Sequence, residues 1–346
     1  MSSRRAGLTQ RRDRRTGGLR RKTSLEECDD KSGRARRSPR LRQRVAWMYY
    51  VEEMTQSAIA DALGIGRITV VRLLAEARSM NDVRISLARD ISDLAGLEIE
   101  VQKRFKIGEA VVAPLSDPAG DARAVIAAAA GEYVSRLLKP DMKIGLGWGE
   151  TLSRMLGYLE ERPAPRLSVV SLLGGIMRAR AANPAECAWQ FSRVYMADCY
   201  MLAAPAIVDS RETKRSLIER CGLGEVYELA EALDAVVVGV GGGKSLDIAR
   251  SYGLVSEEEV AELKARGAIG NILYNFFDAD GCLVDHSINA RAMSIPIESL
   301  RKAPSRIIVA GGADKVEAIA AACRLLRPTT LVIDEATAKA MVALAV

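Results

Sequence analysis

Apolar, β-branched runs alternate with helical segments from residue 108 to the end of the chain. Seven runs are typical of strands, at residues 110–115, 143–148, 167–173, 200–206, 235–240, 306–310 and 331–334. Helical segments follow them, near residues 121–138, 151–160, 184–198, 211–220, 256–265, 315–326 and 335–344. Continuously apolar strands that alternate with helices indicate a parallel sheet covered on both faces. The sequence therefore predicts an α/β domain over residues 108–346.

Glycines directly follow four of the predicted strands. They stand in G-L-G-W-G-E-T (145–151), L-G-G (173–175), G-V-G-G-G-K (239–244) and A-G-G-A-D-K (310–315). In an open α/β sheet the ligand lies beyond the carboxyl ends of the strands, and glycine there lets backbone amides approach it closely. The N-terminus of the next helix favours an anion. One such turn is often only steric, but four in one domain predict a pocket for a sugar or a polyol phosphate.

The stretch V-V-V-G-V-G-G-G-K-S (236–245) raises the alternative of a nucleotide-hydrolysing enzyme. The phosphate loop of such an enzyme requires G-x-x-x-x-G-K-[ST], and its first glycine would have to be residue 238, which is Val238. The spacing therefore fails by one residue. We interpret Gly239 and Gly241 as glycines beside an effector, and we expect Lys244 and Ser245 in a solvated loop before the next helix.

Three short helical segments precede the α/β domain, over residues 39–87. The first ends near Met54, Thr55 caps the second, and Gly64-Ile65-Gly66 separates the second from the third. Two helices joined by a tight glycine-containing turn are typical of a helix-turn-helix, whose second helix enters the major groove. An ordinary three-helix packing unit is the alternative. The residues expected at DNA are Gln56, Ser57, Arg67, Thr69, Val70 and Arg72, although Val70 also fits the inward face of its helix.

The segment between these two domains is expected to form a linker. V-R-I-S-L (83–87) alternates like a short strand, and residues 88–107 indicate a helix with Ile91, Leu94, Leu97 and Val101 on one side. Such a helix would pair subunits, because a helix-turn-helix usually reads two half-sites as a dimer.

Basic charge is concentrated at the N-terminus. Residues 1–44 hold 16 Lys and Arg against 5 Asp and Glu, a net charge of +11, whereas the rest of the chain carries −5. We expect residues 1–38 to form a disordered basic arm that makes sequence-independent phosphate contacts. The alternative is an incidental tail or a start codon placed too early.

The remaining composition excludes several classes of protein. The chain has no run of about 18 apolar residues and no secretory signal, so it is expected to be cytoplasmic, with no membrane partner. Its six cysteines show no C-x-x-C spacing and it has one histidine, so neither a metal site nor a cofactor is expected.

Several motifs occur in a fixed order along the chain. The helix-turn-helix reads T-Q-x-x-I-A-x-x-L-G-I-x-R-x-T-V-x-R-L-L, and the larger domain contains G-W-G-E-T (147–151), L-L-G-G (172–175), A-A-P-A-I-V (203–208), D-A-V-V-V-G-V-G (234–241), G-A-I-G-N-I (267–272), F-F-D-A-D-G (276–281) and A-G-G-A-D-K (310–315). In this order the chain resembles the SorC type of sugar-binding transcriptional regulator, close to the DeoR group, over roughly residues 40–346. The resemblance implies an effector domain similar to sugar-phosphate isomerases and glucosamine-phosphate deaminases. It also implies a sugar or sugar-phosphate effector that retunes operator DNA binding, and a homodimer or homotetramer.

The resemblance further implies an effector site. Carried over by position, its residues are Gly147, Trp148, Gly149, Thr151, Gly174, Gly175, Arg178, Asn183, Gly239, Gly241, Asp278, Gly311, Gly312 and Lys315. In this set Asp278 faces effector hydroxyls, while Lys315 and Arg178 pair with an anionic group. The chain departs from the family at Gly66, where serine is frequent, and at Ile68 and Val71, where polar residues are usual. Apolar groups there contact thymine methyls or signal an unusual operator.

An isomerase or deaminase is the alternative function, because the domain resembles such enzymes. Enolisation of a sugar phosphate needs a carboxylate or histidine base. The available carboxylates are Asp278, Asp280, Asp285 and Glu186, and His286, in the polar stretch D-H-S-I-N, is expected at the surface. The attached helix-turn-helix favours regulation, so we expect no enzymatic activity and assign no catalytic residue.

Overall fold

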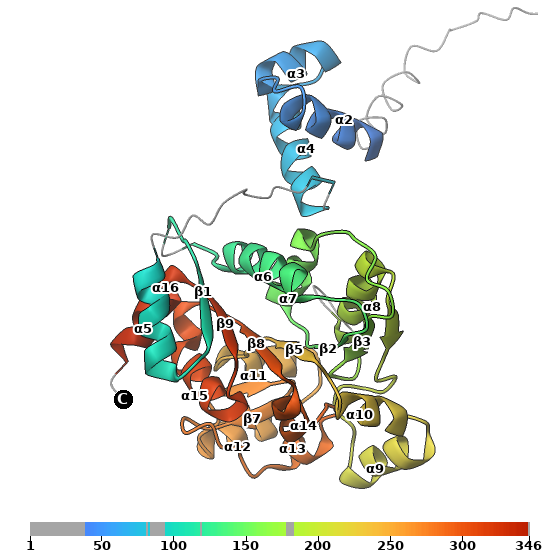
Figure 1. Cartoon of the computed structure of the whole chain (residues 1–346), viewed down its shortest axis with the longest axis vertical. Helices are drawn as coiled ribbons and strands as arrows, with labels where there is room; N and C mark the ends of the chain where they lie inside the picture. Colours follow the sequence, from blue (N-terminus) through green and yellow to red (C-terminus); the bar gives the residue numbers. More distant parts are fainter. Residues whose placement is uncertain (1–38, 81, 84–93, 118–119, 178–182, 345–346) are drawn as a thin grey trace, which may run out of the picture. The chain divides into compact units, whose positions relative to one another are not determined.

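The computed structural model describes residues 39–80, 82–83, 94–117, 120–177 and 183–344. The chain divides between residues 83 and 84 into two compact units. Figure 1 shows that the first is purely helical and that in the second helices surround a sheet. The basic arm, most of the strand expected at 83–87, the start of the expected linker helix and Arg178 lie outside the described residues.

The first unit has the three helices that the sequence predicts, α2 (Pro39–Tyr50), α3 (Gln56–Leu63) and α4 (Arg67–Ser79). The Thr55 hydroxyl caps α3 by accepting a hydrogen bond from the amide of Ala58 at 3.2 Å. Gly64 ends α3 in the left-handed conformation, at φ 61° and ψ 36°, which glycine adopts without a steric penalty. Gly66 precedes α4 with an extended backbone. The turn between α3 and α4 is therefore the glycine-containing turn of a helix-turn-helix.

A small apolar core and one charged cluster hold the three helices together. Val45, Ile59 and Leu74, one from each helix, are buried against one another. Arg42 on α2 pairs with Asp82, just beyond α4, and with Glu76 at 3.4 Å. The hydrogen bond from Arg42 lowers the pKa of Asp82, so this carboxylate stays charged at neutral pH. The charged cluster ties the end of α4 to α2.

The second unit is built on a seven-stranded parallel sheet with the strand order β1-β9-β8-β5-β2-β3-β4. Six strands lie where the sequence predicts them, and the seventh, expected at 200–206, ends instead at Tyr200. Beyond Tyr200 the regular strand pairing stops, and the chain returns only as an isolated parallel bridge between Pro205 and Gly175, in which the amide of Ala206 donates to the carbonyl of Gly175. The seven strands are β1 (Glu109–Ala113), β2 (Lys143–Leu146), β3 (Ser168–Ser171), β4 (Asp198–Tyr200), β5 (Ala235–Val238), β8 (Ser305–Val309) and β9 (Thr330–Asp334).

Both faces of the sheet are covered, as the apolar strands predict. Successive strand residues point to opposite faces, so Val237 lies in one core while Val236 and Val238 lie in the other. The first core is closed by α6 (Arg123–Leu137), α7 (Glu150–Met155) with η1 (Leu156–Tyr158), and α8 (Pro184–Tyr195). The second core is closed by α5 (Ala95–Phe105), α10 (Gly224–Ala230), α11 (Lys244–Ser251), α12 (Glu257–Ala265), α14 (Ile297–Lys302), α15 (Val316–Leu326) and α16 (Glu335–Ala343).

Two expectations about these elements are corrected. Helix α5 is not a free-standing linker, because its Val101 is buried in the same core as strand β1. Lys244 and Ser245 do not lie in a solvated loop but begin α11. The Ser245 hydroxyl donates to the carbonyl of Gly242 at 2.5 Å and accepts from the Asn271 amide group at 2.7 Å, which fixes this turn.

Several elements went unpredicted because they are short. An antiparallel hairpin of β6 (Gly270–Ile272) and β7 (Asn275–Phe277) follows α12. Helix α13 (Ser287–Arg291) and the single turn η2 (Ala313–Lys315) are also new, whereas α9 (Arg211–Arg220) lies where it was predicted. The hairpin matters most, because it borders the carboxyl ends of the central strands.

Candidate DNA-binding and effector sites

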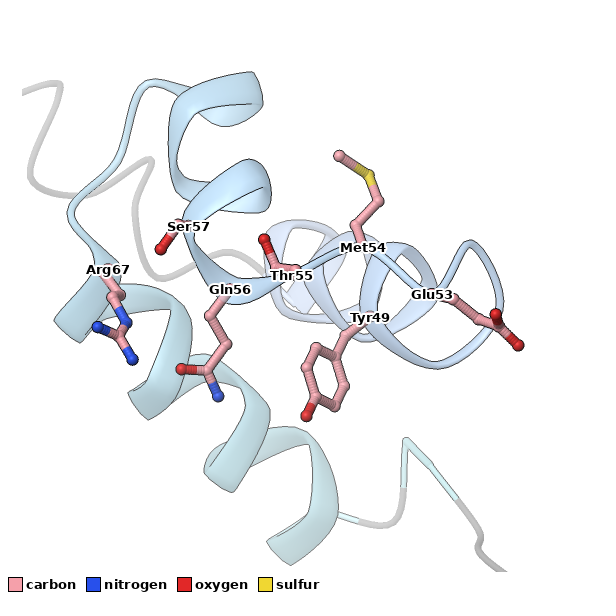
Figure 2. Close-up of a pocket in the computed structure, with 7 residues that line it drawn as sticks. All are labelled: Tyr49, Glu53, Met54, Thr55, Gln56, Ser57 and Arg67. Carbon is pink, nitrogen blue, oxygen red and sulfur yellow. The ribbon is translucent and has the colours of Figure 1, made fainter.

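The N-terminal ends of α3 and α4 border one open hollow in the helical unit. Its volume is about 630 Å³, and its lining residues are Tyr49, Glu53, Met54, Thr55, Gln56, Ser57 and Arg67. Figure 2 shows the side chains of Tyr49, Gln56 and Arg67 extending toward the same side. Ser57 and Arg67 are exposed and Gln56 is half-buried. The structure thus brings three of the residues expected at DNA to one surface.

The buried and exposed faces of α4 are sharply separated. Val70 is wholly buried with Leu73 and Leu74 in the three-helix core, which corrects its assignment to the DNA-contacting set. The opposite face carries Ile68, which is 87% exposed, together with Val71 at 46% and the exposed Arg72. Thr69 is half-buried between the two faces. The outward surface of α4 is therefore basic and apolar.

In the α/β unit, loops from the central strands meet at the carboxyl edge of the sheet. The carbonyl of Trp148, after β2, lies 3.5 Å from where a Cβ on Gly239, after β5, would stand. The Leu273 side chain, in the hairpin, lies 3.4 Å from where a Cβ on Gly147 would stand. The Lys315 side chain, after β8, lies 2.9 Å from where a Cβ on Gly242 would stand. The sheet thus gathers Gly147, Trp148, Gly239 and Lys315 into one region.

The predicted glycines serve different purposes. A Cβ on Gly174, Gly241 or Gly311 would lie within 2.6 Å of other protein atoms, so these three are required for packing. Gly149 and Gly312 have φ of 132° and 111°, values that other residues rarely adopt. A Cβ on Gly239 or Gly175 would have no neighbour closer than 3.5 Å. Gly149 alone among these glycines has open space where a Cβ would stand, whereas Gly239 and Gly175 would tolerate a Cβ at ordinary contact distance.

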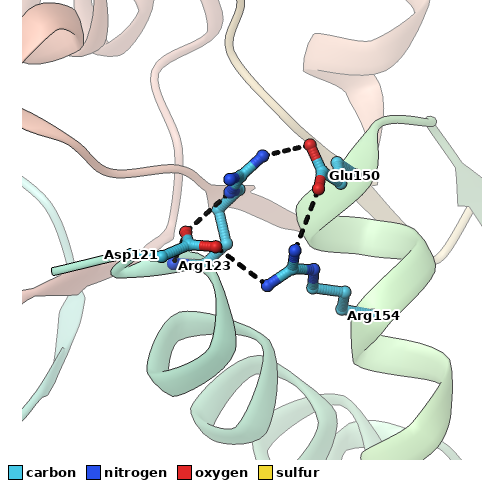
Figure 3. Close-up of polar contacts among 4 residues, drawn as sticks. All are labelled: Asp121, Arg123, Glu150 and Arg154. Atoms are coloured by element: carbon cyan, nitrogen blue, oxygen red, sulfur yellow. Dashed lines mark hydrogen bonds and ion pairs between the residues drawn. The ribbon is translucent and has the colours of Figure 1, made fainter. Parts of the chain in front are cut away.

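Four charged side chains form a closed ring at this edge (Figure 3), which we call the charge ring: Asp121, Arg123, Glu150 and Arg154. Arg123 lies 2.6 Å from Asp121 and also pairs with Glu150. Arg154 lies 3.1 Å from Asp121 and 2.9 Å from Glu150. The hydrogen bond from Arg123 is the main cause that lowers the pKa of Asp121 to about 2. The ring joins the loop after β1 to α6 and α7, and sequence reasoning missed it, although Glu150 belongs to the G-W-G-E-T motif.

Lys315 lies within electrostatic range of the charge ring. Its neighbour Asp314 pairs at 3.4 Å with Lys244, and no ion pair joins Lys315 to any carboxylate of the described residues. Burial lowers the pKa of Lys315, Arg123 lowers it further, and Asp314 and Glu150 raise it. A half-buried cation beside a second cation is an arrangement that an anionic ligand would stabilise.

The other residues carried over by position lie elsewhere or are already engaged. Asn183 caps α8 by accepting from the amide of Ala185 at 3.3 Å, and its amide group donates to the carbonyl of Ile176 at 2.7 Å. The Asp278 carboxylate accepts from the amides of Asp280 and Cys282 in its own turn. That turn packs beside the middle of α15, where a Cβ on Gly281 would lie 2.6 Å from the Ala321 carbonyl. Thr151 is half-buried in the first turn of α7.

The burial of the single histidine differs from the sequence prediction, which placed it at the surface. His286 is buried rather than at the surface. Its Nδ1 accepts from the amide of Ile288 at 3.2 Å, and its Nε2 lies 3.0 Å from a carboxylate oxygen of Glu262. The ring caps α13, and both nitrogens have protein partners, which gives it a structural role.

A helix-turn-helix joined to an α/β unit with a polar, glycine-lined edge defines a ligand-responsive transcriptional regulator. Residues 89–343 match a family described as "Putative sugar-binding domain". The chain belongs to the SorC-type sugar-binding transcriptional regulators. The matched region begins before the domain boundary expected at residue 108 and includes α5.

Three named relatives illustrate the likeness. The erythritol catabolism regulatory protein EryD of Brucella abortus is 30% identical over 305 residues, which cover 87% of this chain and 96% of EryD. The transcriptional regulator LsrR of Klebsiella pneumoniae is 32% identical over 326 residues, which cover 91% of this chain and 96% of LsrR. The crystal structure of the full-length sorbitol operon regulator SorC from Klebsiella pneumoniae superposes with a TM-score of 0.67 at 28% identity, covering 88% of this chain and 98% of SorC. All three are regulators, so the enzyme alternative is not supported.

Within the described ranges, the helices are too short or too polar to cross a membrane.

Proposed function

We propose that the helical unit binds operator DNA, and that a sugar, polyol or sugar phosphate bound at the carboxyl edge of the sheet changes the affinity for that DNA. The protein would act in the cytoplasm as a homodimer or homotetramer that reads two half-sites. The observation that carries the proposal is the combination, in one chain, of a helix-turn-helix whose α4 has an exposed face with an α/β unit of the sugar-binding family.

On the DNA side, α4 would enter the major groove with its exposed face. Arg67 and Arg72 would donate to guanine or phosphate oxygens, and Ile68 would contact a thymine methyl group. Ser57, in the first turn of α3, would reach a backbone phosphate, favoured by the positive N-terminal end of that helix. Val70 takes no part, because it is buried.

On the effector side, Lys315 and the charge ring would bind the anionic part of a phosphorylated effector. The half-buried Lys315 gains more from an anion than an exposed lysine does, because solvent screens it less. Gly239, where a Cβ would meet nothing closer than 3.5 Å, would face the bound molecule. The protein would have one arrangement that is competent to bind DNA and one that is not. An effector that binds these two arrangements with unequal affinity would shift the population between them, and with it the DNA affinity.

The DNA-binding half of the proposal is tested with a double variant, Arg67→Ala with Arg72→Ala. Duplexes are first selected from a random library with the full-length wild-type protein, and affinities are then measured by fluorescence anisotropy. Each arginine that contacts a base contributes about 1–3 kcal/mol, so the variant should bind at least about tenfold more weakly.

Arg78→Ala provides the matched control, because Arg78 is exposed on the last turn of the same helix. It should bind the selected duplexes as the wild type does. Unchanged binding by the double variant would contradict the assignment of α4 as the recognition helix.

A further inference from the structure

Tyr274 has a buried hydroxyl with no hydrogen-bond partner. The residue is 3% exposed, and within the described part of the chain only two buried side-chain polar atoms lack a partner, Tyr274 Oη and Arg162 Nε. Arg162 still donates through Nη2 to the carbonyl of Ser135. Tyr274 therefore has no such compensation. Leaving a buried hydroxyl unpaired costs roughly 1–3 kcal/mol, so it calls for an explanation.

The backbone that carries Tyr274 is also in an unfavourable conformation. Leu273 and Tyr274 form the two-residue turn between β6 and β7, with φ of 53° and 58°. A turn of this kind favours Asn-Gly, because both residues are left-handed. Bulky residues in that conformation cost about 1–2 kcal/mol each and persist only where surrounding contacts enforce them.

Those enforcing contacts are present. Asn271 accepts a hydrogen bond from the amide of Tyr274 at 3.2 Å. The side chain of Asn275 donates to the carbonyls of Ile272 and Leu273 and to the Ser294 hydroxyl, at 3.0 to 3.3 Å. Three polar side chains thus hold the turn in place while the hydroxyl that it positions stays unpaired.

The turn lies at the carboxyl edge of the sheet. The Tyr274 ring is 5.6 Å from the ring of Trp148, in the loop after β2, with an angle of 45° between the ring planes. Leu273 packs against Gly147, and Asn271 bonds to Ser245 at the start of α11. Trp148 itself is half-buried, so within the aromatic pair part of Trp148 faces solvent.

We propose that Tyr274 is a specificity-determining residue of the effector site, whose hydroxyl bonds to a hydroxyl group of a sugar or polyol that lies beside Trp148. The inference rests on the proposed function. An aromatic surface with one placed polar group is the usual lining of a site for such a ligand. Burial raises the pKa of Tyr274, so the group is a neutral donor, as recognition of a sugar hydroxyl requires.

The test is Tyr274→Phe in the full-length protein, with thermal unfolding followed alone and with four probes: erythritol, sorbitol and the phosphate ester of each. Without a probe, the variant should unfold at the same temperature as the wild type or higher, because an unpaired buried hydroxyl has been removed. The apparent Kd of any probe that stabilises the wild type should rise about tenfold, the effect of losing one neutral hydrogen bond.

Tyr227→Phe is the matched control. Its hydroxyl donates to the carbonyl of Ser294 at 3.3 Å in the same core, so this variant should unfold at a lower temperature and keep the probe affinity. A lower unfolding temperature for Tyr274→Phe without probe, or an unchanged probe Kd, would overturn the inference. A wild type that no probe stabilises would contradict the proposed effector class itself.

Discussion

At the scale of single residues, glycines at the strand ends separate into those where a side chain would clash with protein and those where a Cβ would fit. A methyl group on Gly241 would lie 2.5 Å from the Asn271 amide nitrogen and 2.7 Å from the Cβ of Ser245. A methyl group on Gly239 would meet nothing closer than 3.5 Å. The sequence motif is the same, G-V-G, but the two positions have different neighbours.

We therefore predict opposite outcomes for two alanine variants. Gly241→Ala should lower the free energy of unfolding by about 1–3 kcal/mol, the usual cost of overpacking. Gly239→Ala should change it by less than about 0.5 kcal/mol. Urea unfolding of both variants measures this, and equal losses of stability would contradict the packing described for the loop after β5.

Sequence reasoning located these glycines but not the role of each. The pattern places Gly239 and Gly241 after an apolar strand, whereas the neighbour that forbids a side chain, Asn271, comes from a hairpin that is too short to predict. Asn183 was assigned to a ligand and caps a helix instead. The unpaired state of Tyr274 depends on the positions of surrounding atoms, which no local pattern records.

At the scale of elements, the seven parallel strands followed from their continuous apolar runs, because burial on both faces leaves a strong signal. The charge ring did not, since its four residues come from two segments that meet only after folding. Helix α11 was missed because three glycines precede it and glycine usually ends regular structure.

The charge ring makes the α/β unit sensitive to acid. Because the pKa of Asp121 is lowered to about 2 in the folded protein, the ring stabilises the fold above the usual aspartate pKa and loses this contribution as the pH falls toward 2. The effect is modest, since the side chains of the ring are 39% to 42% exposed and solvent screens them.

Asp121→Asn should therefore unfold more easily than the wild type at pH 6 but equally easily near pH 2. Chemical unfolding of both proteins across this range gives the comparison. Asp141→Asn serves as the control, because Asp141 pairs with Arg166 away from the ring and its pKa is likewise lowered. A stability difference for Asp121→Asn that grows as the pH falls would contradict the ring's charge assignment.

At the scale of the whole molecule, the unequal distribution of charge predicts how salt affects DNA binding. Residues 1–38 carry 13 Lys and Arg against 5 Asp and Glu. Each phosphate that the arm neutralises adds about 0.9 to the slope of log K against log salt. Deleting residues 1–38 should flatten that slope while leaving the preferred DNA sequence unchanged.

A full-length chain with glutamine at the arm's 13 basic positions separates charge from length. It should show the same flattened slope as the deletion. If the slope of the deleted protein equals that of the wild type, the arm takes no part in binding.

The central claim is that one molecule couples an effector at the sheet edge to DNA at the helix-turn-helix. The most direct measurement is the Kd of the full-length protein for its selected duplex, by fluorescence anisotropy, with and without a saturating polyol or polyol phosphate that stabilises the protein against heat. The account predicts a change in Kd of about 5- to 150-fold, the usual size of allosteric coupling. A duplex Kd that stays the same at saturating effector would contradict it.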